Sequence, residues 1–477
     1  MLVGIDVGTS VVKAAAFDES GRALAVESCP ARVRAGDGRV EQDAEEVVEA
    51  VGRVLGALTA GRPAPTAVGL TGQGDGVWLI DREARPVRPA ISWMDGRAAP
   101  IVAEWTANGV AHEVFRRTGN TLFPGGPAPL LAWLDRHEPE SLDAAATAAY
   151  CKDMVLQRLT GVRGTDVSDA SVPFLDPHTR DYDAEAVAAC GLTHRAGLLA
   201  PVVEPRPAGE ALPGGPLPAG VPISAGPFDV PACALGAGAT EPGDGLLIIG
   251  TTLACLAVVA EPDLAGEPAG FHFATGRRDR WLRGMPAMVG TAALDWVLGA
   301  VGAAHRDLDE LLAASPPGAH GVRVLPFFSP AGERAPFLEP AARAEITGVS
   351  LETTSADLVR ATCEGIAFAA RHCLTAAGLA GDLAVAGGGT RSETWLGLFA
   401  DVLGRPLRVA AAEAGARGAV LAAAGHLDAA AWTRPASVRD PDAGGARFYE
   451  EEYRAYLRRV AAARERWRDA GPDRRRD

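Results

Sequence analysis

The first residues of the chain combine a carboxylate, a turn of small residues and a lysine at a spacing that suits phosphate binding. Residues 2–17 form two apolar runs joined by a corner of Gly8, Thr9 and Ser10. Glycine permits the tight backbone of such a corner, and the exposed N–H groups form a concavity that binds anions. Asp6 can hold Mg²⁺ or its waters against a phosphate there, and Lys13 can return toward the turn. The simpler interpretation is an ordinary β-hairpin, because short motifs have real false-positive rates.

A similar element recurs near the start of the second half of the chain. Residues 246–259 again read as strand, turn and strand, and the turn is formed by Gly250, Thr251 and Thr252. Strand runs flanking a short glycine-containing corner are typical of a hairpin. Two such hairpins predict a duplicated fold that grips a polyphosphate from both sides.

A loop suited to hydroxyl recognition follows a buried strand at residues 67–70. Residues 71–76 read Thr-Gly-Gln-Gly-Asp-Gly. In open α/β sheets, ligands gather beyond the carboxyl ends of the strands, where this loop is expected to lie. Gln73 offers a donor and an acceptor and Asp75 a strong acceptor, so both are candidates for reading substrate hydroxyls. A glycine-rich turn carrying a surface aspartate is the alternative.

The surrounding pattern alternates strands with helices, which indicates an α/β fold. Asp43 is expected to cap a helix with an apolar stripe through residues 47–58, and Ser355 to cap another helix over 356–377. Further helices are expected over 414–424 and 447–468. Asp229 follows a Gly-Pro turn at the start of a predicted short helix, where an aspartate is usually a cap.

Length and composition limit the class of protein. With 477 residues the chain exceeds one ordinary core, so two domains are expected. A hydrophobic content of 48% and a charged content of 22% describe a globular protein. The net charge of −14 argues against nucleic acid or an anionic membrane as a partner. Lys13 and Lys152 are the only lysines, so no Gly-Lys-Ser/Thr phosphate loop exists. Seven cysteines without metal-site spacing and the absence of a visible signal peptide favour a cytoplasmic location.

The two hairpins resemble those of the superfamily of actin, the heat-shock chaperone ATPases and the sugar kinases. Other runs narrow the resemblance to the FGGY carbohydrate kinases: residues 91–97 are similar to the family's Trp-Asn-Asp-x-Arg segment, and residues 332–336 match Gly-Glu-Arg-x-Pro. The loop at 71–76 looks most like that of erythritol kinase-like members, with xylulose kinase-like members next. The sequence departs from the family pattern at Leu130 and Val230, which carry apolar side chains where the family has polar ones.

The resemblance implies a fold of two duplicated ribonuclease H-like, actin-like ATPase domains with a cleft between them. It places an N-terminal sugar-binding domain with the first phosphate loop at 1–232 and a C-terminal ATP-binding domain at 233–435. Residues 436–477 would form a helical tail.

The resemblance also implies roles for particular residues. Asp229 would be the general base, Trp93 a wall of the sugar site, and the glycine loop of residues 387–389 the adenosine contact. The expected catalytic residues are Asp229 and Asp6, and Asp6 is also the expected metal ligand. The expected substrate contacts are Gln73, Gly74, Asp75, Trp93 and Asp229. The expected ATP contacts are Gly8, Thr9, Ser10, Lys13, Gly250, Thr251, Thr252, Gly387, Gly388 and Gly389.

The function implied is ATP- and Mg²⁺-dependent phosphorylation of a primary hydroxyl on a small polyol or sugar, in the cytoplasm. Members of the family are often dimers, so the resemblance allows a homodimer. Hydroxyl recognition by Asp75 and Gln73 favours an erythritol-like open-chain polyol. Gly74 and Gly125 are expected to leave more room on one side of the pocket than the longer side chains of relatives do. A xylulose or other pentulose kinase is the first alternative. An inactive sugar-binding sensor and an actin-like ATPase are alternatives of other classes.

Overall fold

The computed structural model describes residues 1–470. The chain divides into two compact units, and each unit is built from three segments that are separated in the sequence. The first comprises Met1–Gly238, Ala260–Leu282 and Ala411–Arg434, and the second comprises Ala239–Val259, Arg283–Ala410 and the chain from Pro435. The division expected from sequence motifs at 232 and 435 stays a prediction, and residues 471–477 of the expected tail lie outside the described part.

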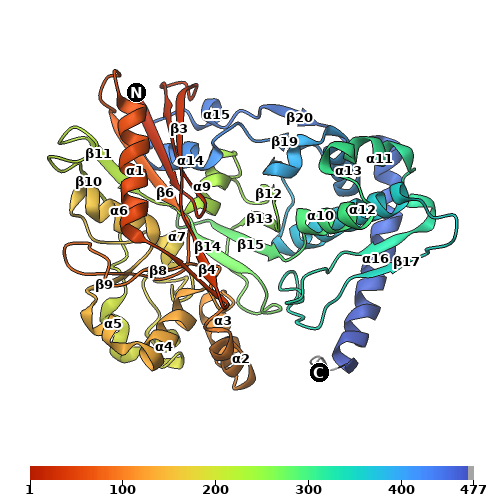
Figure 1. Cartoon of the computed structure of the whole chain (residues 1–477), viewed down its shortest axis with the longest axis horizontal. Coiled ribbons are helices and arrows are strands. Elements are labelled where there is room, and N and C mark those ends of the chain that lie inside the picture. Colours follow the sequence, from red (N-terminus) through yellow and green to blue (C-terminus); the bar gives the residue numbers. More distant parts are fainter. Residues whose placement is uncertain (471–477) are drawn as a thin grey trace. The chain divides into compact units, whose positions relative to one another are not determined.

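The first unit is built around a mixed sheet (Figure 1). Its strands are β1 (Leu2–Val7), β2 (Val11–Phe17), β3 (Ala23–Pro30), β4 (Arg34–Gly36), β5 (Arg39–Gln42), β6 (Ala67–Gly72), β7 (Trp78–Ile80), β8 (Ala90–Ile91), β9 (Thr147–Ala149), β10 (Ala208–Glu210), β11 (Pro222–Ala225) and β14 (Phe271–Ala274). Its helices are α1 (Ala44–Thr59), α2 (Ala99–Ala107), α3 (Val110–Thr118), α4 (Pro127–His137), α5 (Pro139–Ala144), α6 (Cys151–Thr160), α7 (Val167–Ala170), α8 (Ala184–Ala189), α9 (Asp229–Gly236), α14 (Ala414–Ala423) and α15 (Ala429–Trp432).

The main sheet of this unit has the strand order β10-β11-β6-β1-β2-β3. Strands β1, β6 and β11 are parallel, with Asp6 opposite Thr71 and Leu70 opposite Ala225. Strand β2 returns antiparallel to β1, which confirms the hairpin expected at the start of the chain. Because the three parallel strands end at one edge, the segments that follow them meet there.

Both faces of this sheet are covered. Helix α1 packs its apolar stripe on one face, and Asp43 caps it by accepting from the N–H groups of Glu45 and Glu46, as predicted. Helix α14 lies against the other face at unusually short range. A Cβ atom at Gly4 would lie 2.2 Å from the Ala416 carbonyl oxygen, and one at Gly69 2.2 Å from that of Ala419. Only glycine at these two strand positions lets the helix backbone rest on β1 and β6.

Helices α9 and α14 also pack against each other at glycines, which let the two backbones come into contact. A Cβ at Gly236 would lie 1.9 Å from the Ala414 carbonyl oxygen, and one at Gly418 1.8 Å from that of Ala232. Such contacts leave no space for a side chain, because real Cβ atoms essentially never approach this closely. The packing therefore fixes α9, whose first residue is Asp229, against the helix that lies on β1.

The second unit repeats the arrangement of a hairpin beside a parallel strand. Its strands are β12 (Gly245–Ile249), β13 (Leu253–Val259), most of β15 (Trp281–Ala287), β16 (Arg323–Leu325), β17 (Glu345–Thr347), β18 (Leu383–Ala386), β19 (Leu407–Val409) and β20 (Ser437–Arg439). Its helices are α10 (Thr291–Ala300), α11 (Leu308–Ala314), α12 (Ser355–Ala377), α13 (Glu393–Leu403) and α16 (Ala443–Ala470). Strand β12 pairs antiparallel with β13 and parallel with β18, so the second expected hairpin is confirmed.

Two sequence expectations about helix ends need correction. Thr354, not Ser355, caps α12, and it forms a reciprocal capping box with Asp357. The box satisfies two backbone N–H groups at once, which a serine one position later cannot do. Helix α16 begins at Ala443, four residues before the expected start. Within residues 1–470, no helix is long and apolar enough to cross a membrane.

Candidate active site

Three carboxylates lie at the edge where β1, β6 and β11 end. Asp6 is the second-to-last residue of β1, Asp75 follows β6, and Asp229 is the first residue of α9, which follows β11. Burial, together with the charges of Asp6 and Asp75, raises the pKa of Asp229 to about 8. Asp6 and Asp75 are therefore each close enough to Asp229 to repel its carboxylate electrostatically. The sheet topology brings together the aspartates that the sequence singled out separately.

Asp6 has the surroundings of an incomplete cation site. Lys13 stands opposite it in the β1–β2 register and forms an ion pair with Glu413 at 3.0 Å. Burial raises the pKa of Asp6 to about 6, against the charge of Lys13. Its Oδ1 atom is buried with no hydrogen-bond partner among the described residues. Its Oδ2 atom faces α14, where a Cβ at Gly415 would lie 2.9 Å away.

The carboxylate of Asp6 fits Mg²⁺ that is bound together with a phosphate better than it fits a metal ion held by protein ligands alone. No group of three or more His, Cys, Asp or Glu residues within 1–470 is arranged to hold a metal ion. Mg²⁺ is usually bound through one or two carboxylates together with substrate phosphates. The unpaired oxygen of Asp6 is such a carboxylate donor.

The loop before Asp229 is fixed from two sides. The Thr71 hydroxyl donates to the Pro227 carbonyl at 2.7 Å, and the Phe228 N–H donates to the Ser168 hydroxyl at 3.1 Å. Gly226 has φ +124° and lies against Asp166, where a Cβ would approach the carboxyl carbon to 2.9 Å. The end of β6 and the helix α7 thus hold the turn that presents Asp229.

Helix α7 is itself anchored by a buried lysine. The Nζ atom of Lys152 lies 2.6 Å from Asp153, 3.0 Å from Asp166 and 2.9 Å from Asp169, and the lysine is fully buried. Burial raises the pKa of Asp169 well above its usual range, with the neighbouring carboxylates adding to the rise. One lysine cannot neutralise three carboxylates, so burial in this cluster favours the protonated form of Asp169. Asp153 and Asp169 are ion-pair partners here, and Asp166 is the helix cap.

A closed hydrogen-bond network joins the first phosphate turn to the sugar loop. The Trp93 indole N–H donates to the Thr9 hydroxyl at 2.9 Å, and that hydroxyl donates to Gln73 Oε1 at 3.1 Å. The Gln73 amide donates to Gln42 Oε1 at 2.8 Å, and the Gln42 amide donates to the Thr9 carbonyl at 3.0 Å. Gln42 was not singled out in the sequence, because a glutamine before a helix carries no motif.

This network bears on the roles expected of its members. The Gln73 amide is buried and already paired with protein groups, so its contact with a substrate hydroxyl stays a prediction. Trp93 keeps 38% of its surface exposed and can still form a wall. Asp75 has φ +57°, a conformation uncommon for a residue other than glycine. Such local strain is often found at functional positions.

In the second unit, the expected nucleotide segments meet at the end of β12. Gly387 has φ +96°, and a Cβ there would lie 2.6 Å from the Ile249 carbonyl oxygen. A Cβ at Gly389 would lie 2.2 Å from the Ile249 side chain. The glycine loop therefore rests directly on the strand that leads into the Gly250–Thr252 turn. Contacts of either segment with ATP stay predictions.

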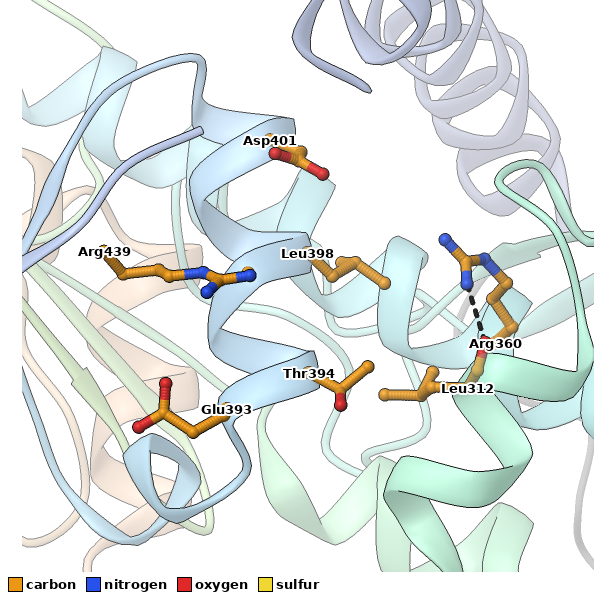
Figure 2. Close-up of a pocket in the computed structure, with 8 residues that line it drawn as sticks. Leu312, Arg360, Glu393, Thr394, Leu398, Asp401 and Arg439 are labelled. Carbon is orange, nitrogen blue, oxygen red and sulfur yellow. Dashed lines mark hydrogen bonds between the residues drawn. The ribbon is translucent and has the colours of Figure 1, made fainter. Parts of the chain in front are cut away.

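A pocket of ≈ 320 Å³ lies along α13, the helix that follows the glycine loop (Figure 2). Its lining consists of Leu312, Arg360, Glu393, Thr394, Gly397, Leu398, Asp401 and Arg439. Arg360 donates to two backbone carbonyls, of Leu312 and Ser315, and is thus committed to the fold. None of the three loop glycines lines this pocket, so it does not define the adenosine contact.

Family models match nearly the whole chain. The model described as the N-terminal domain of the FGGY family of carbohydrate kinases covers residues 1–236, and that of the C-terminal domain covers residues 245–426. The chain belongs to the FGGY family of carbohydrate kinases. It is a phosphotransferase that uses ATP and an alcohol group as acceptor.

Individual relatives of this FGGY kinase agree with that placement. It is 35% identical to an erythritol kinase of Brucella abortus (strain 2308), with 96% of this chain and 95% of the relative covered. It is 31% identical to a xylulose kinase of Escherichia coli (strain K12), with coverage of 85% and 86%. Among solved structures, the xylulose kinase of Rhodospirillum rubrum is similar with a TM-score of 0.88, 28% identity and coverage of 98% and 99%. The expected family and two-domain α/β fold are confirmed.

Proposed function

We propose that this FGGY kinase phosphorylates a primary hydroxyl of a small open-chain polyol, with erythritol as the first candidate. The proposal assigns Asp229 as general base, Asp75 as hydroxyl acceptor, and Asp6 as the protein ligand of Mg²⁺. Three acidic side chains at one sheet edge support this division of roles. The erythritol kinase relative supports the choice of polyol.

The reaction requires positioning and charge neutralisation more than covalent chemistry. Asp229 accepts the proton of the attacking hydroxyl, and its carboxyl group then holds that proton until the proton is released. Asp75 accepts hydrogen bonds from the remaining hydroxyls and so orients the acceptor. The turn at Gly8–Ser10, with Lys13 beside it, binds phosphate oxygens. Bound Mg²⁺ would neutralise charge on the ATP phosphates, held by the free oxygen of Asp6.

The single observation that carries the proposal is the state of Asp229. The residue that precedes α9 as its N-cap is Phe228, and no side-chain cap is formed, so Asp229 is not an ordinary helix cap. Its pKa of about 8 is close to physiological pH. Efficient general bases have a pKa near the operating pH. A half-buried carboxylate with no capping duty is therefore suited to proton transfer.

A second candidate is a pentulose such as xylulose, because several relatives and solved neighbours are named as xylulose kinases. A coupled ADP-release assay over tetritols, pentitols and pentuloses tests both candidates. The polyol proposal requires the highest kcat/KM for a tetritol or pentitol. A higher value for a pentulose than for every polyol would replace it with the second candidate.

The pH dependence of kcat/KM follows from the raised pKa of Asp229. Since the base must be ionised, we expect kcat/KM for the acceptor to fall about tenfold per pH unit below pH 8. Replacement of Asp75 by Asn removes a like charge, so it should move this limb to lower pH. A profile that is flat between pH 6 and 8 would place the general base elsewhere.

Replacement of Asp75 by Ala tests the hydroxyl-binding role. We expect kcat/KM for the preferred acceptor to fall. The fall should correspond to a loss of about 1.5–3 kcal/mol of transition-state stabilisation, the range for hydrogen bonds to a charged group. Basal ATP hydrolysis should stay unchanged, because Asp75 acts on the acceptor. Glu49→Ala removes an exposed carboxylate on α1 and serves as the control. If Asp75→Ala abolishes ATP binding, or leaves kcat/KM unchanged for every acceptor, Asp75 does not read the substrate.

A cytoplasmic location, a homodimeric state and the absence of nucleic-acid or membrane partners belong to the same proposal. The net charge of −14 supports the last of these.

A further inference from the structure

The space expected beside Gly74 is filled by an aromatic ring from another part of the chain. A Cβ atom at Gly74 would lie 2.6 Å from Cδ2 of Phe228 and 3.0 Å from two further atoms of the ring. Position 74 therefore tolerates no side chain while this ring is in place. The sequence expectation that Gly74 opens room for substrate is corrected by this contact, because Phe228 and Gly74 occupy the site as a complementary pair.

The ring of Phe228 is held rigidly. Its backbone N–H donates to Ser168, and the preceding carbonyl of Pro227 accepts from Thr71. The ring packs edge-on against Phe273, with centroids 5.1 Å apart, and only 5% of the residue is exposed. Edge-to-face pairs of this kind add to the energy of burial. The backbone hydrogen bonds fix the residue's position, and the ring cannot swing aside to admit a larger ligand without losing its contact with Phe273.

The position of the ring relates it to the acceptor. Phe228 directly precedes Asp229, and Gly74 directly precedes Asp75. The ring thus lies where the strand ends that carry the proposed base and the proposed hydroxyl acceptor come together. The charge of Asp75 contributes to the raised pKa of Asp229, which agrees with the two carboxylates lying near each other at these strand ends.

We propose that Phe228 determines acceptor size, by walling the space beside Asp75 and Asp229 so that four-carbon polyols are preferred over longer acceptors. This inference rests on the proposed function. A hydrophobic wall discriminates between substrates that differ by one carbon by roughly 10–200-fold. Removal of the ring should therefore favour longer acceptors over short ones, rather than lower all rates equally.

The test measures kcat/KM for a tetritol and for a pentitol in Phe228→Ala and Phe228→Leu variants. We expect the pentitol-to-tetritol ratio to rise at least about tenfold in Phe228→Ala and by a smaller factor in Phe228→Leu. Phe271→Ala is the matched control, because Phe271 stacks on Phe273 at 5.8 Å in the same aromatic row. Its ratio should equal that of the wild type. If Phe228→Ala does not fold, the leucine variant decides.

A double-mutant cycle tests the contact itself. Gly74→Ala should lower kcat/KM for both acceptors, because its Cβ meets the ring. In the Phe228→Ala background the same substitution should cost several-fold less. A ratio unchanged in both Phe228 variants, or equal costs of Gly74→Ala in both backgrounds, would overturn the inference alone. A wild-type enzyme inactive on every acceptor would overturn the proposed function and this inference with it.

Discussion

Replacement of Asp229 by Asn will lower kcat by roughly 10²–10⁴-fold, the contribution typical of general acid–base catalysis. Asparagine has the shape of the aspartate but cannot accept the proton of the attacking hydroxyl. The loop that holds the residue is fixed by Thr71 and Ser168 through backbone groups, so the substitution leaves its position unchanged. ATP affinity, measured by calorimetry or by thermal shift, should stay near the wild-type value.

Thermal stability provides the control for this variant. The pKa of Asp229 is about 8 in the folded protein against 3.8 for an ordinary aspartate. The neutral form is thus favoured by the fold, and stability from this group is lost as pH rises from about 4 through 8. Asp229→Asn removes that loss, so its Tm should exceed the wild-type Tm at pH 8 and match it near pH 4. Turnover close to the wild-type rate in a folded variant would refute the assignment.

Much of the fold could be predicted from local pattern. The two hairpins have apolar strands on either side of a small-residue turn, and such patterns depend on neighbours in sequence. The cap at Asp43 and the helix that follows it are likewise local. The cap of α12 was misplaced by one residue because Thr354 and Ser355 are both good caps, and only the reciprocal bond with Asp357 separates them.

The candidate site was predictable as a set of residues but not as a set of contacts. Asp6 lies near the end of β1, and Asp75 and Asp229 follow β6 and β11, but only the sheet topology shows that these three strands are neighbours. The commitment of Gln73 to Gln42 and Thr9 depends on a residue with no motif of its own. Spacing along the chain carries no information about such long-range partners.

The packing of the site could not be predicted from the sequence, for a related physical reason. A glycine in a motif reads as room for ligand, yet Gly74 makes room for Phe228, which lies 154 positions later in the chain. Gly4 and Gly69 likewise read as ordinary strand residues, and their role appears only with α14 in place. Whether an absent side chain leaves a cavity or admits a neighbour is decided by tertiary packing.

Replacement of Asp6 by Ala will lower kcat by about 10²-fold or more and raise the Mg²⁺ concentration that gives half-maximal activity. The reason is the Oδ1 atom of Asp6, a buried carboxylate oxygen beside the first phosphate turn that has no hydrogen-bond partner within residues 1–470. Acceptor binding, followed as the Tm shift with polyol, should survive. Glu19→Ala, an exposed carboxylate at the far end of β2, is the matched control and should leave the Mg²⁺ titration unchanged.

The proton competes with the metal at Asp6, which sharpens this prediction. Since the pKa of Asp6 is raised to about 6, the half-maximal Mg²⁺ concentration of the wild type should increase below pH 6, where the carboxyl is protonated. The Asp6→Ala variant has no group to protonate there and should lack this increase. Identical Mg²⁺ titrations in wild type and variant, at pH 7 and at pH 5.5, would show that the metal is held without Asp6. In that case the favourable charge partner of Asp6 would be Lys13, which stands opposite it in the hairpin.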